Sequence, residues 1–228
     1  MLADALQTLL QRLDNAARSA GRPAPRLLAV SKRQAATAVA ELHAAGQRAF
    51  GENYVQEAIA KQDALASLDI EWHLIGHLQS NKAREAAERF DWVQTVDRAR
   101  LVATLARHRP PGRAPLNVLI QVNVDDEASK HGCTPGQIEP LAAAIAAEPA
   151  LRLRGLMAIP APLEDLQRRR DAFRRMRLLF EALCARHPAI DTLSMGMSED
   201  IELAVAEGAT LVRVGTALFG ARPPKETA

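Results

Sequence analysis

The stretch Arg26-Leu27-Leu28-Ala29-Val30-Ser31-Lys32 decides the fold of this 228-residue chain. Its apolar run predicts a short buried strand over residues 27–32, and the pattern after it predicts a helix over 35–45. A strand that leads directly into a helix is the repeating unit of parallel α/β folds. The predicted strand ends in a lone lysine, Lys32, and barrels of this kind place their reactive groups at the carboxyl ends of the strands.

The same alternation continues along the rest of the chain. The predicted strands cover residues 27–32, 48–51, 71–76, 91–96, 117–124, 152–159, 192–196 and 211–215. The predicted helices cover residues 35–45, 54–66, 80–89, 98–108, 135–147, 164–186 and 199–207. A helix over 2–18, with leucines at helical spacing, precedes the first strand.

Eight strand–helix units favour an α/β fold, namely a single (βα)8 TIM barrel with an extra N-terminal helix. In this interpretation residues 1–228 form one domain. A doubly wound open sheet is the alternative. No helix is expected after the eighth strand, so the leading helix is expected to fill that place.

Composition narrows the function classes. The net charge is +2, which supplies no electrostatic case for nucleic acid or an anionic membrane as a partner. Cys133 and Cys184 are too few and too widely spaced for a disulfide framework or a zinc site. The N-terminus lacks a signal-peptide pattern, and no apolar run approaches a membrane span. A cytoplasmic protein with reduced thiols is the expectation.

Lys32 is the first candidate site residue. Strand alternation puts Leu28, Val30 and Lys32 on one face, and we expect that face to be the barrel interior. Desolvation there would lower the pKa of an amine and favour it as a Schiff-base nucleophile. A surface lysine at the start of a loop is the alternative.

A second signal lies in Leu211-Val212-Arg213-Val214-Gly215-Thr216-Ala217-Leu218-Phe219-Gly220. The valines on either side of Arg213 predict that the arginine faces the interior, where a cation needs an anion or acceptor. A structural ion pair would satisfy it. So would the pyridine nitrogen of pyridoxal 5′-phosphate (PLP), which Arg or Asp can hold. The loops after strands seven and eight of barrels often bind phosphate, which places Ser198, Gly215 and Thr216 at such a site.

Several other polar residues have ordinary explanations. Ser198 also suits the N-cap of a helix with Glu199 and Asp200 in its first turn. His73 and His77 are four residues apart in a predicted strand, so they do not form a one-faced metal-binding pair. Tyr54 is interpreted as a residue at a helix start. The loop that ends at Lys130 and the arginine run 168–170 are expected to be solvated.

Seven segments, taken together, resemble the pyridoxal phosphate homeostasis proteins. They are Leu28-Ala29-Val30-Ser31-Lys32, Phe50-Gly51-Glu52-Asn53-Tyr54-Val55-Gln56-Glu57, Trp72-His73-Leu74-Ile75-Gly76-His77-Leu78-Gln79-Ser80-Asn81-Lys82, Val122-Asn123, Arg154-Gly155-Leu156-Met157, Leu193-Ser194-Met195-Gly196-Met197-Ser198 and Val212-Arg213-Val214-Gly215-Thr216-Ala217-Leu218-Phe219-Gly220. They occur in order and span residues 26–222, nearly the whole chain.

The resemblance implies a barrel like the N-terminal domain of bacterial alanine racemase, with PLP as cofactor and no metal. It makes Lys32 the Schiff-base lysine and Arg213 the partner of the pyridine nitrogen. It assigns the remaining cofactor contacts to two groups: phosphate contacts at Ser198, Gly215 and Thr216, and pocket residues Asn53, His77, Ser194 and Met195.

The resemblance also implies a role. Family members are described as PLP carriers or regulators of vitamin B6 balance, so we expect a monomer that holds PLP without dedicated catalytic turnover and hands it to PLP-dependent apo-enzymes. Alanine racemase takes its second base, a tyrosine, from a further domain that is not seen here, and Tyr54 is the one tyrosine of the chain. A slow PLP-dependent amino-acid racemase is the alternative. A barrel enzyme that forms a Schiff base with a phosphorylated sugar, without PLP, is a third possibility.

Overall fold

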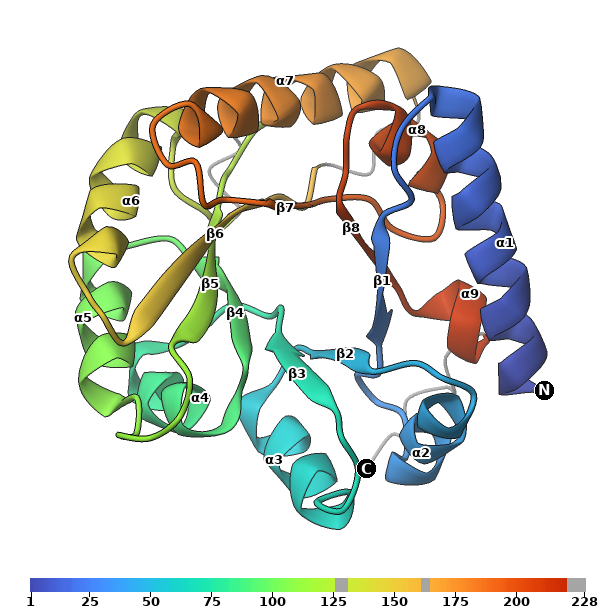
Figure 1. The fold of residues 1–228 in the computed structure, drawn as a ribbon, viewed down its shortest axis with the longest axis horizontal. Helices are drawn as coiled ribbons and strands as arrows, with labels where there is room; N and C mark the ends of the chain where they lie inside the picture. The colour runs from blue at the N-terminus through green and yellow to red at the C-terminus, as the bar shows by residue number, and fades with distance from the viewer. Residues whose placement is uncertain (126–130, 161–164, 221–228) are drawn as a thin grey trace.

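The computed structural model describes residues 1–125, 131–160 and 165–220, and these residues form one closed barrel of eight parallel strands (Figure 1). The strands follow one another around the barrel in chain order, and the last pairs with the first. They are β1 (Arg26–Val30), β2 (Ala49–Glu52), β3 (Glu71–Leu74), β4 (Trp92–Val96), β5 (Leu116–Gln121), β6 (Leu151–Met157), β7 (Thr192–Ser194) and β8 (Leu211–Val214). The predicted TIM barrel is confirmed, and the open sheet is wrong.

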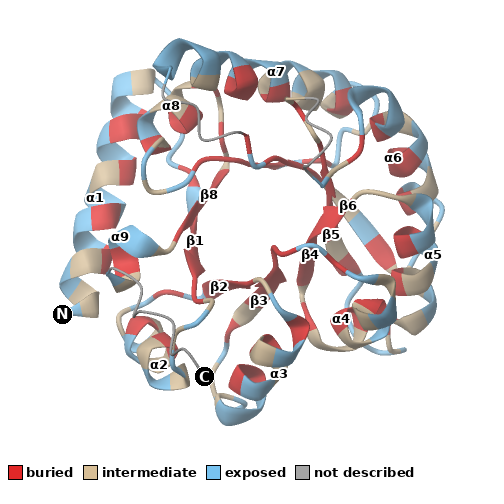
Figure 2. Cartoon of the chain, turned by 180° about the vertical axis from the view of Figure 1, so that it is seen from behind, coloured by how far each residue is buried: buried red, intermediate tan, exposed pale blue. Residues whose placement is uncertain are grey.

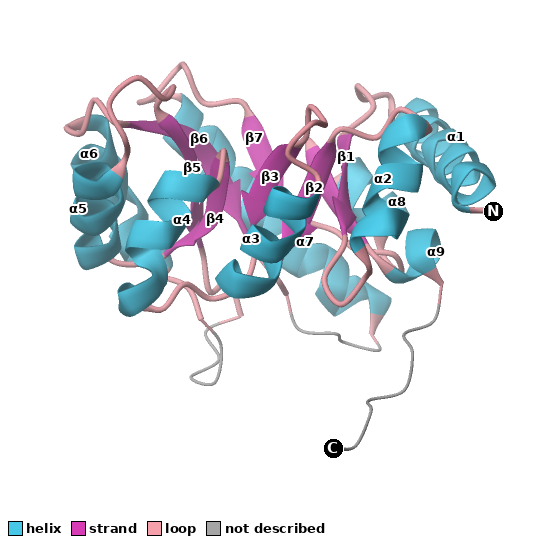
Figure 3. Cartoon of the chain, turned by 90° about the horizontal axis from the view of Figure 1, so that it is seen from below, coloured by secondary structure: helices cyan, strands magenta, loops and turns pink. Residues whose placement is uncertain are grey.

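Helices form an outer ring around the strands (Figures 1 and 3). They are α1 (Leu2–Ala20), α2 (Ala36–Ala44), α3 (Val55–Ala64), η1 (Ser80–Lys82), α4 (Ala83–Arg89), α5 (Ala99–His108), η2 (Pro135–Gln137), α6 (Ile138–Ala146), α7 (Leu166–Cys184), α8 (Ile201–Ala206) and α9 (Thr216–Phe219), where η marks a 3-10 helix. No helix in the described ranges is long and apolar enough to cross a bilayer.

The strands are buried on both faces (Figure 2). Leu28 and Val30 belong to a small apolar cluster with Ile75 inside the barrel, whereas Leu27 and Ala29 join the larger core between strands and helices. Period-two alternation therefore works here as predicted, and it places the residues just after Val30 at the mouth of the barrel.

The extra N-terminal helix α1 packs beside α8 and α9 on the outside of the barrel (Figure 1). Leu6, Leu9 and Leu13 form its buried stripe, as their spacing predicts. The helix ends at Gly21, whose φ of 61° lies in the left-handed region that favours glycine. Helix α1 thus lies against the last two helices of the barrel.

Two expectations about the chain end are wrong. A short helix, α9, does follow the eighth strand over Thr216–Phe219. Helix α8 begins at Ile201 after Asp200, so Ser198 is not its N-cap. The Asp200 carboxylate instead accepts a hydrogen bond from the Met197 amide at 2.6 Å, which closes a turn before the helix and leaves Ser198 in the loop.

Several strands end one to three residues earlier in the structure than the sequence predicts. The predicted strand 152–159 ends at Met157, and 192–196 ends at Ser194, because the chain leaves the barrel there to form loops over its mouth. The helices predicted over 80–89 and 135–147 each begin with a 3-10 turn. Residue 164, Lys130 and residues 221–228 lie outside the described residues.

Candidate functional site

A cavity of about 330 Å³ lies at the carboxyl ends of the strands. Such ends carry the active sites of this barrel type. The cavity contains six of the residues singled out from the sequence: Lys32, Asn53, Ser198, Arg213, Gly215 and Thr216. Its other lining residues are Val30, Ile75, Ile159, Pro160, Arg169, Met197, Glu199 and Asp200. Residues from the first and last strands, about 180 positions apart in the chain, therefore meet in one space.

Lys32 stands in the turn that follows β1, half-buried at the cavity. The next residue, Arg33, has a φ of 61°, a left-handed conformation that is uncommon outside glycine. Its amide donates to the Glu57 carboxylate. On the other side of Lys32, the Ser31 carbonyl accepts from the Lys61 ammonium at 2.6 Å. The backbone is thus held on both sides of Lys32.

Lys61 is itself at the centre of a buried charge cluster. Its Nζ lies 2.7 Å from Glu52 Oε1 and 2.8 Å from Glu57 Oε1, and Ser31 Oγ donates to Glu52 at 2.6 Å. Burial raises the pKa of Glu52, although the Lys61 and Ser31 hydrogen bonds act in the opposite direction. Sequence analysis missed this cluster. The four-residue spacing of Glu57 and Lys61 was a signal, but the same spacing is common in solvated helices.

Arg213 is buried in the barrel interior and faces the cavity, as its place between two valines predicts. Its Nη1 donates to Ser194 Oγ at 2.7 Å, and its Nη2 donates to the Ala158 carbonyl at 2.8 Å. Burial lowers the pKa of Arg213 to about 10, so the side chain stays charged at neutral pH. The structural ion pair considered as an alternative is not found in the described residues, where both guanidinium bonds go to uncharged oxygens.

The remaining wall of the cavity is formed by the loops after β7 and β8. Gly215 directly follows β8, and a Cβ placed on it would lie 3.3 Å from the Val30 carbonyl oxygen. Gly196, after β7, has a φ of 92°, and a Cβ there would lie 2.5 Å from the Ala204 methyl. These two glycines bring the Ser198 loop and the Gly215-Thr216 turn close to the strand ends. The hydroxyls and amides there are suited to binding an anion.

Three predicted site residues lie elsewhere. His77 lines a neighbouring cavity of about 320 Å³, shared with Asn53, and its ring stacks on His131 at 3.7 Å between centroids. Ser194 is fully buried beneath Arg213 and contacts it directly. The Met195 side chain packs in the core between strands and helices. In the described ranges no group of three or more metal-ligating side chains occurs.

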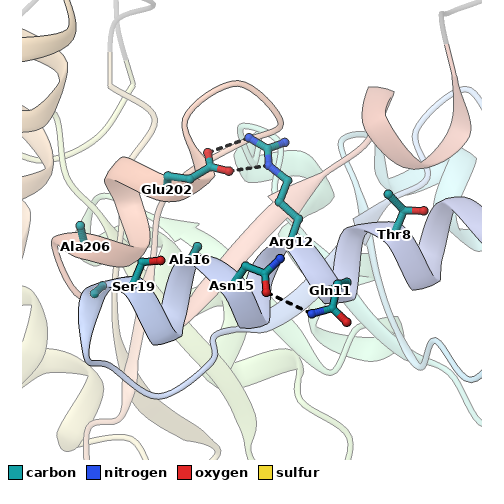
Figure 4. A pocket seen from close by; sticks show the side chains of 9 residues that line it. Thr8, Gln11, Arg12, Asn15, Ala16, Ser19, Glu202 and Ala206 are labelled. Atoms are coloured by element: carbon teal, nitrogen blue, oxygen red, sulfur yellow. Dashed lines mark hydrogen bonds and ion pairs between the residues drawn. The ribbon is translucent and has the colours of Figure 1, made fainter.

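A larger cavity, about 770 Å³, is a groove on the outer face between α1 and α8 (Figure 4). Arg12 crosses the groove and forms a bidentate ion pair with Glu202, in which each hydrogen bond is 2.7 Å long. The same guanidinium donates to the Ser198 carbonyl at 2.8 Å. The groove lies away from the strand ends and is not the candidate site. Its arginine nevertheless connects α1 to the Ser198 loop.

Comparison with known proteins agrees with this fold. The family model described as alanine racemase, N-terminal domain, matches residues 5–223. The pyridoxal phosphate homeostasis protein of Pseudomonas aeruginosa is 53% identical over 97% of this chain and 96% of its own length. The protein of the same name from Escherichia coli K12 is 54% identical over 86% of this chain and 85% of its own.

Solved structures show the same fold. PipY of Synechococcus elongatus, with PLP bound, superposes with a TM-score of 0.83 at 40% identity, covering 96% of this chain and 100% of PipY. PipY without PLP superposes with a TM-score of 0.87 at 41% identity, with the same coverage. Alanine racemase from Corynebacterium glutamicum, at 20% identity and a TM-score of 0.65, shares the fold over 95% of this chain and 63% of the racemase.

Proposed function

The chain belongs to the family of pyridoxal phosphate homeostasis proteins, within the alanine racemase N-terminal domain family, and we propose that it binds PLP in the cavity at the strand ends and serves PLP homeostasis. The names of the two relatives and the PLP bound to PipY support this function. The observation that carries it in this chain is the meeting of Lys32, Arg213 and the Gly215-Thr216 turn on one cavity.

The donor set suits PLP, which brings an aldehyde, a pyridine nitrogen and a phosphate and so supplies carbonyl chemistry toward amines. The cavity offers a primary amine, a buried guanidinium and a rim of hydroxyls and amides. Its volume of about 330 Å³ lies at the lower end of small-molecule pockets. We assign the phosphate to Ser198, Gly215 and Thr216, with Asn53 as a further lining residue, and keep His77, Ser194 and Met195 as residues around the pocket.

Lys32 is the residue that we propose bonds to the cofactor. Its primary amine would hold PLP through the aldehyde of the cofactor, with the aldehyde oxygen lost as water. The other two lysines in the described ranges are unsuited to this role: Lys61 is held between two carboxylates, and Lys82 forms a surface ion pair with Glu85. The bonds on either side of Lys32 hold its backbone beside the cavity.

Arg213 is the proposed partner of the pyridine nitrogen. A charged guanidinium donates a hydrogen bond and takes no proton back, so it leaves that nitrogen unprotonated. An unprotonated ring withdraws electrons more weakly, which suits holding and releasing PLP better than amino-acid chemistry. The one tyrosine of the chain, Tyr54, is largely exposed and lines the neighbouring cavity rather than this one. We therefore propose a monomeric carrier that delivers PLP to apo-enzymes.

The test is an absorbance spectrum of the purified protein with PLP, before and after borohydride, for the wild type, Lys32→Ala and the control Lys82→Ala. The expected result is a visible band in the wild type and in the control, bleached by borohydride and missing in Lys32→Ala. Mass spectrometry of the reduced protein is expected to place the added mass on the peptide containing Lys32. No band in the wild type at saturating PLP would overturn the cofactor assignment.

A further inference from the structure

A continuous column of hydrogen bonds runs from Arg213 through the barrel interior to its opposite end. Arg213 contacts Ser194 at 2.7 Å, and Ser194 Oγ donates to Gln94 Oε1 at 2.7 Å across the barrel. Gln94 Nε2 lies 2.9 Å from His73 Nδ1, and His73 Nε2 lies 2.7 Å from Glu71 Oε1. Arg26 donates to that same carboxylate oxygen at 2.8 Å. The column therefore joins the proposed cofactor pocket to the amino-terminal face of the barrel.

The three middle members of the column are completely buried: Ser194, Gln94 and His73 each have no exposed surface. Most buried polar side chains in proteins have at least one hydrogen-bond partner, and each of these three has two in the column. Trp92 covers the His73 ring at 5.0 Å between centroids and nearly parallel, which holds the imidazole plane in line with the column.

From Arg213 to Glu71 the donors all point the same way, and Arg26 donates to Glu71 from the opposite end. Arginine only donates, so Ser194 Oγ accepts from it and must direct its own proton elsewhere, toward Gln94 Oε1. The Gln94 amide then faces His73 with its NH₂ group, so Nδ1 is the acceptor and the ring proton sits on Nε2. The Glu71 carboxylate accepts the hydrogen bond from that Nε2–H group.

We propose that Gln94 and His73 are positioning residues for Arg213. They orient the Ser194 hydroxyl so that a lone pair faces the guanidinium, which fixes Arg213 where it can donate to a ligand in the cavity. This inference rests on the proposed PLP site and deepens it, because it assigns the control of the pyridine-nitrogen partner to residues that do not line the cavity.

The first test uses Gln94→Met, which keeps the side-chain length and removes both bonds. Its matched control is Gln47→Met, at another buried glutamine, which donates to the Leu27 and Ala49 carbonyls outside the column. Loss of an orienting hydrogen bond to a charged site corresponds to about a tenfold weaker Kd for PLP. We expect Gln94→Met to show this weaker Kd and a shifted absorbance band of the bound PLP. Gln47→Met is expected to keep the Kd and the band of the wild type.

A double-mutant cycle shows whether Gln94 acts through Ser194. If it does, Gln94→Met adds no further loss of PLP affinity in a Ser194→Ala background. Losses that multiply in the double variant would overturn the positioning role, as would a Gln94→Met protein with wild-type Kd and spectrum. Both of those results leave the proposed function intact, since they require a wild type that binds PLP.

A second measurement does not depend on PLP binding by any variant. Nitrogen-15 NMR of the histidine rings, with His73 assigned by its loss in His73→Asn, is expected to show the tautomer protonated at Nε2. A His73 ring protonated at Nδ1 would reverse the donor order and overturn the proposal, whatever the PLP titrations show.

Discussion

At the scale of single residues, the site depends on where two cations are placed. The turn around Lys32 is held by bonds to Ser31 and Arg33 on either side, whereas Arg213 is buried against uncharged oxygens. A buried guanidinium with neutral partners keeps its donors for a further acceptor, and this is the property that a ligand site needs. The Asp200 carboxylate lines the same cavity, and its charge raises the pKa of Arg213 against the larger, lowering effect of burial.

Glu71 makes the free energy of unfolding depend on pH in the acidic range. Burial alone would raise its pKa, but the hydrogen bonds with His73 and Arg26 and the charge of Arg26 outweigh this effect and lower the pKa to about 2. A carboxyl whose pKa is lower in the folded state stabilises the fold above its ordinary value, about 4.3, and loses that contribution as the pH falls toward 2.

We therefore expect wild type to lose more free energy of unfolding than Glu71→Gln between pH 5 and pH 2, by on the order of 1 kcal/mol, since Glu71 is partly exposed to screening water. Urea midpoints at pH 5, 4, 3 and 2 measure this difference. Glu85→Gln, on the surface, is the control and is expected to follow the wild type. Parallel curves for wild type and Glu71→Gln would contradict the lowered pKa.

At the scale of elements, α3 connects the ends of β1 and β2 through one buried lysine. Lys61 reaches from the last turn of α3 to Glu52, the final residue of β2, and to the Ser31 carbonyl just after β1. Glu52 has no exposed surface, so its charge depends on Lys61. The helix therefore sets the position of the turn that carries Lys32.

Lys61→Ala is expected to destabilise the protein by about 3–5 kcal/mol, because it leaves the Glu52 charge buried without its partner. Lys82→Ala, which breaks only a surface ion pair with Glu85, is expected to cost less than about 1 kcal/mol. Chemical denaturation of both variants measures this contrast. Lys61→Met/Glu52→Leu, which removes both charges, is expected to regain most of the loss. Equal costs for the two lysines would show that the buried cluster is not a structural link.

At the scale of the whole molecule, the barrel is closed but its seams are unequal. Strands β5 and β6 pair over six register positions, whereas β7 and β8 share one, Ser194 opposite Leu211. Residues beside this short seam hold Arg213 and the proposed phosphate turn. The pair of strands with the shortest register is therefore the pair next to the proposed ligand site.

Amide hydrogen exchange is expected to be faster in the peptides covering β7 and β8 than in those covering β5 and β6. Addition of PLP is expected to slow exchange more at β7 and β8, because a ligand that bridges Ser198 and Gly215 stabilises the closed seam. Mass spectrometry of the wild type with and without PLP measures both effects, and the β5 and β6 peptides serve as the internal control. Uniform protection around the barrel would contradict the weak seam.

The sequence by itself determined the order of the strands, the barrel and the inward direction of Arg213, and it placed Lys32 near the end of the first strand, which the structure ends two residues earlier at Val30. These are local properties, since side chains alternate with a period of two along each strand whatever lies around it. It also indicated the glycine-containing loops that carry the proposed phosphate contacts.

Only the tertiary structure decided the contacts that make those residues work. Closure of the barrel brings Ser194 onto Gln94 across 100 positions of sequence and puts Lys61 beneath the turn of Lys32. It also moved Ser198 from a helix cap into a loop, because the Asp200 carboxylate closes the turn first. Buried glutamine, histidine and lysine have no periodic signal of their own. Their partners lie on other strands and helices, and only the packing of those elements determines which polar groups meet.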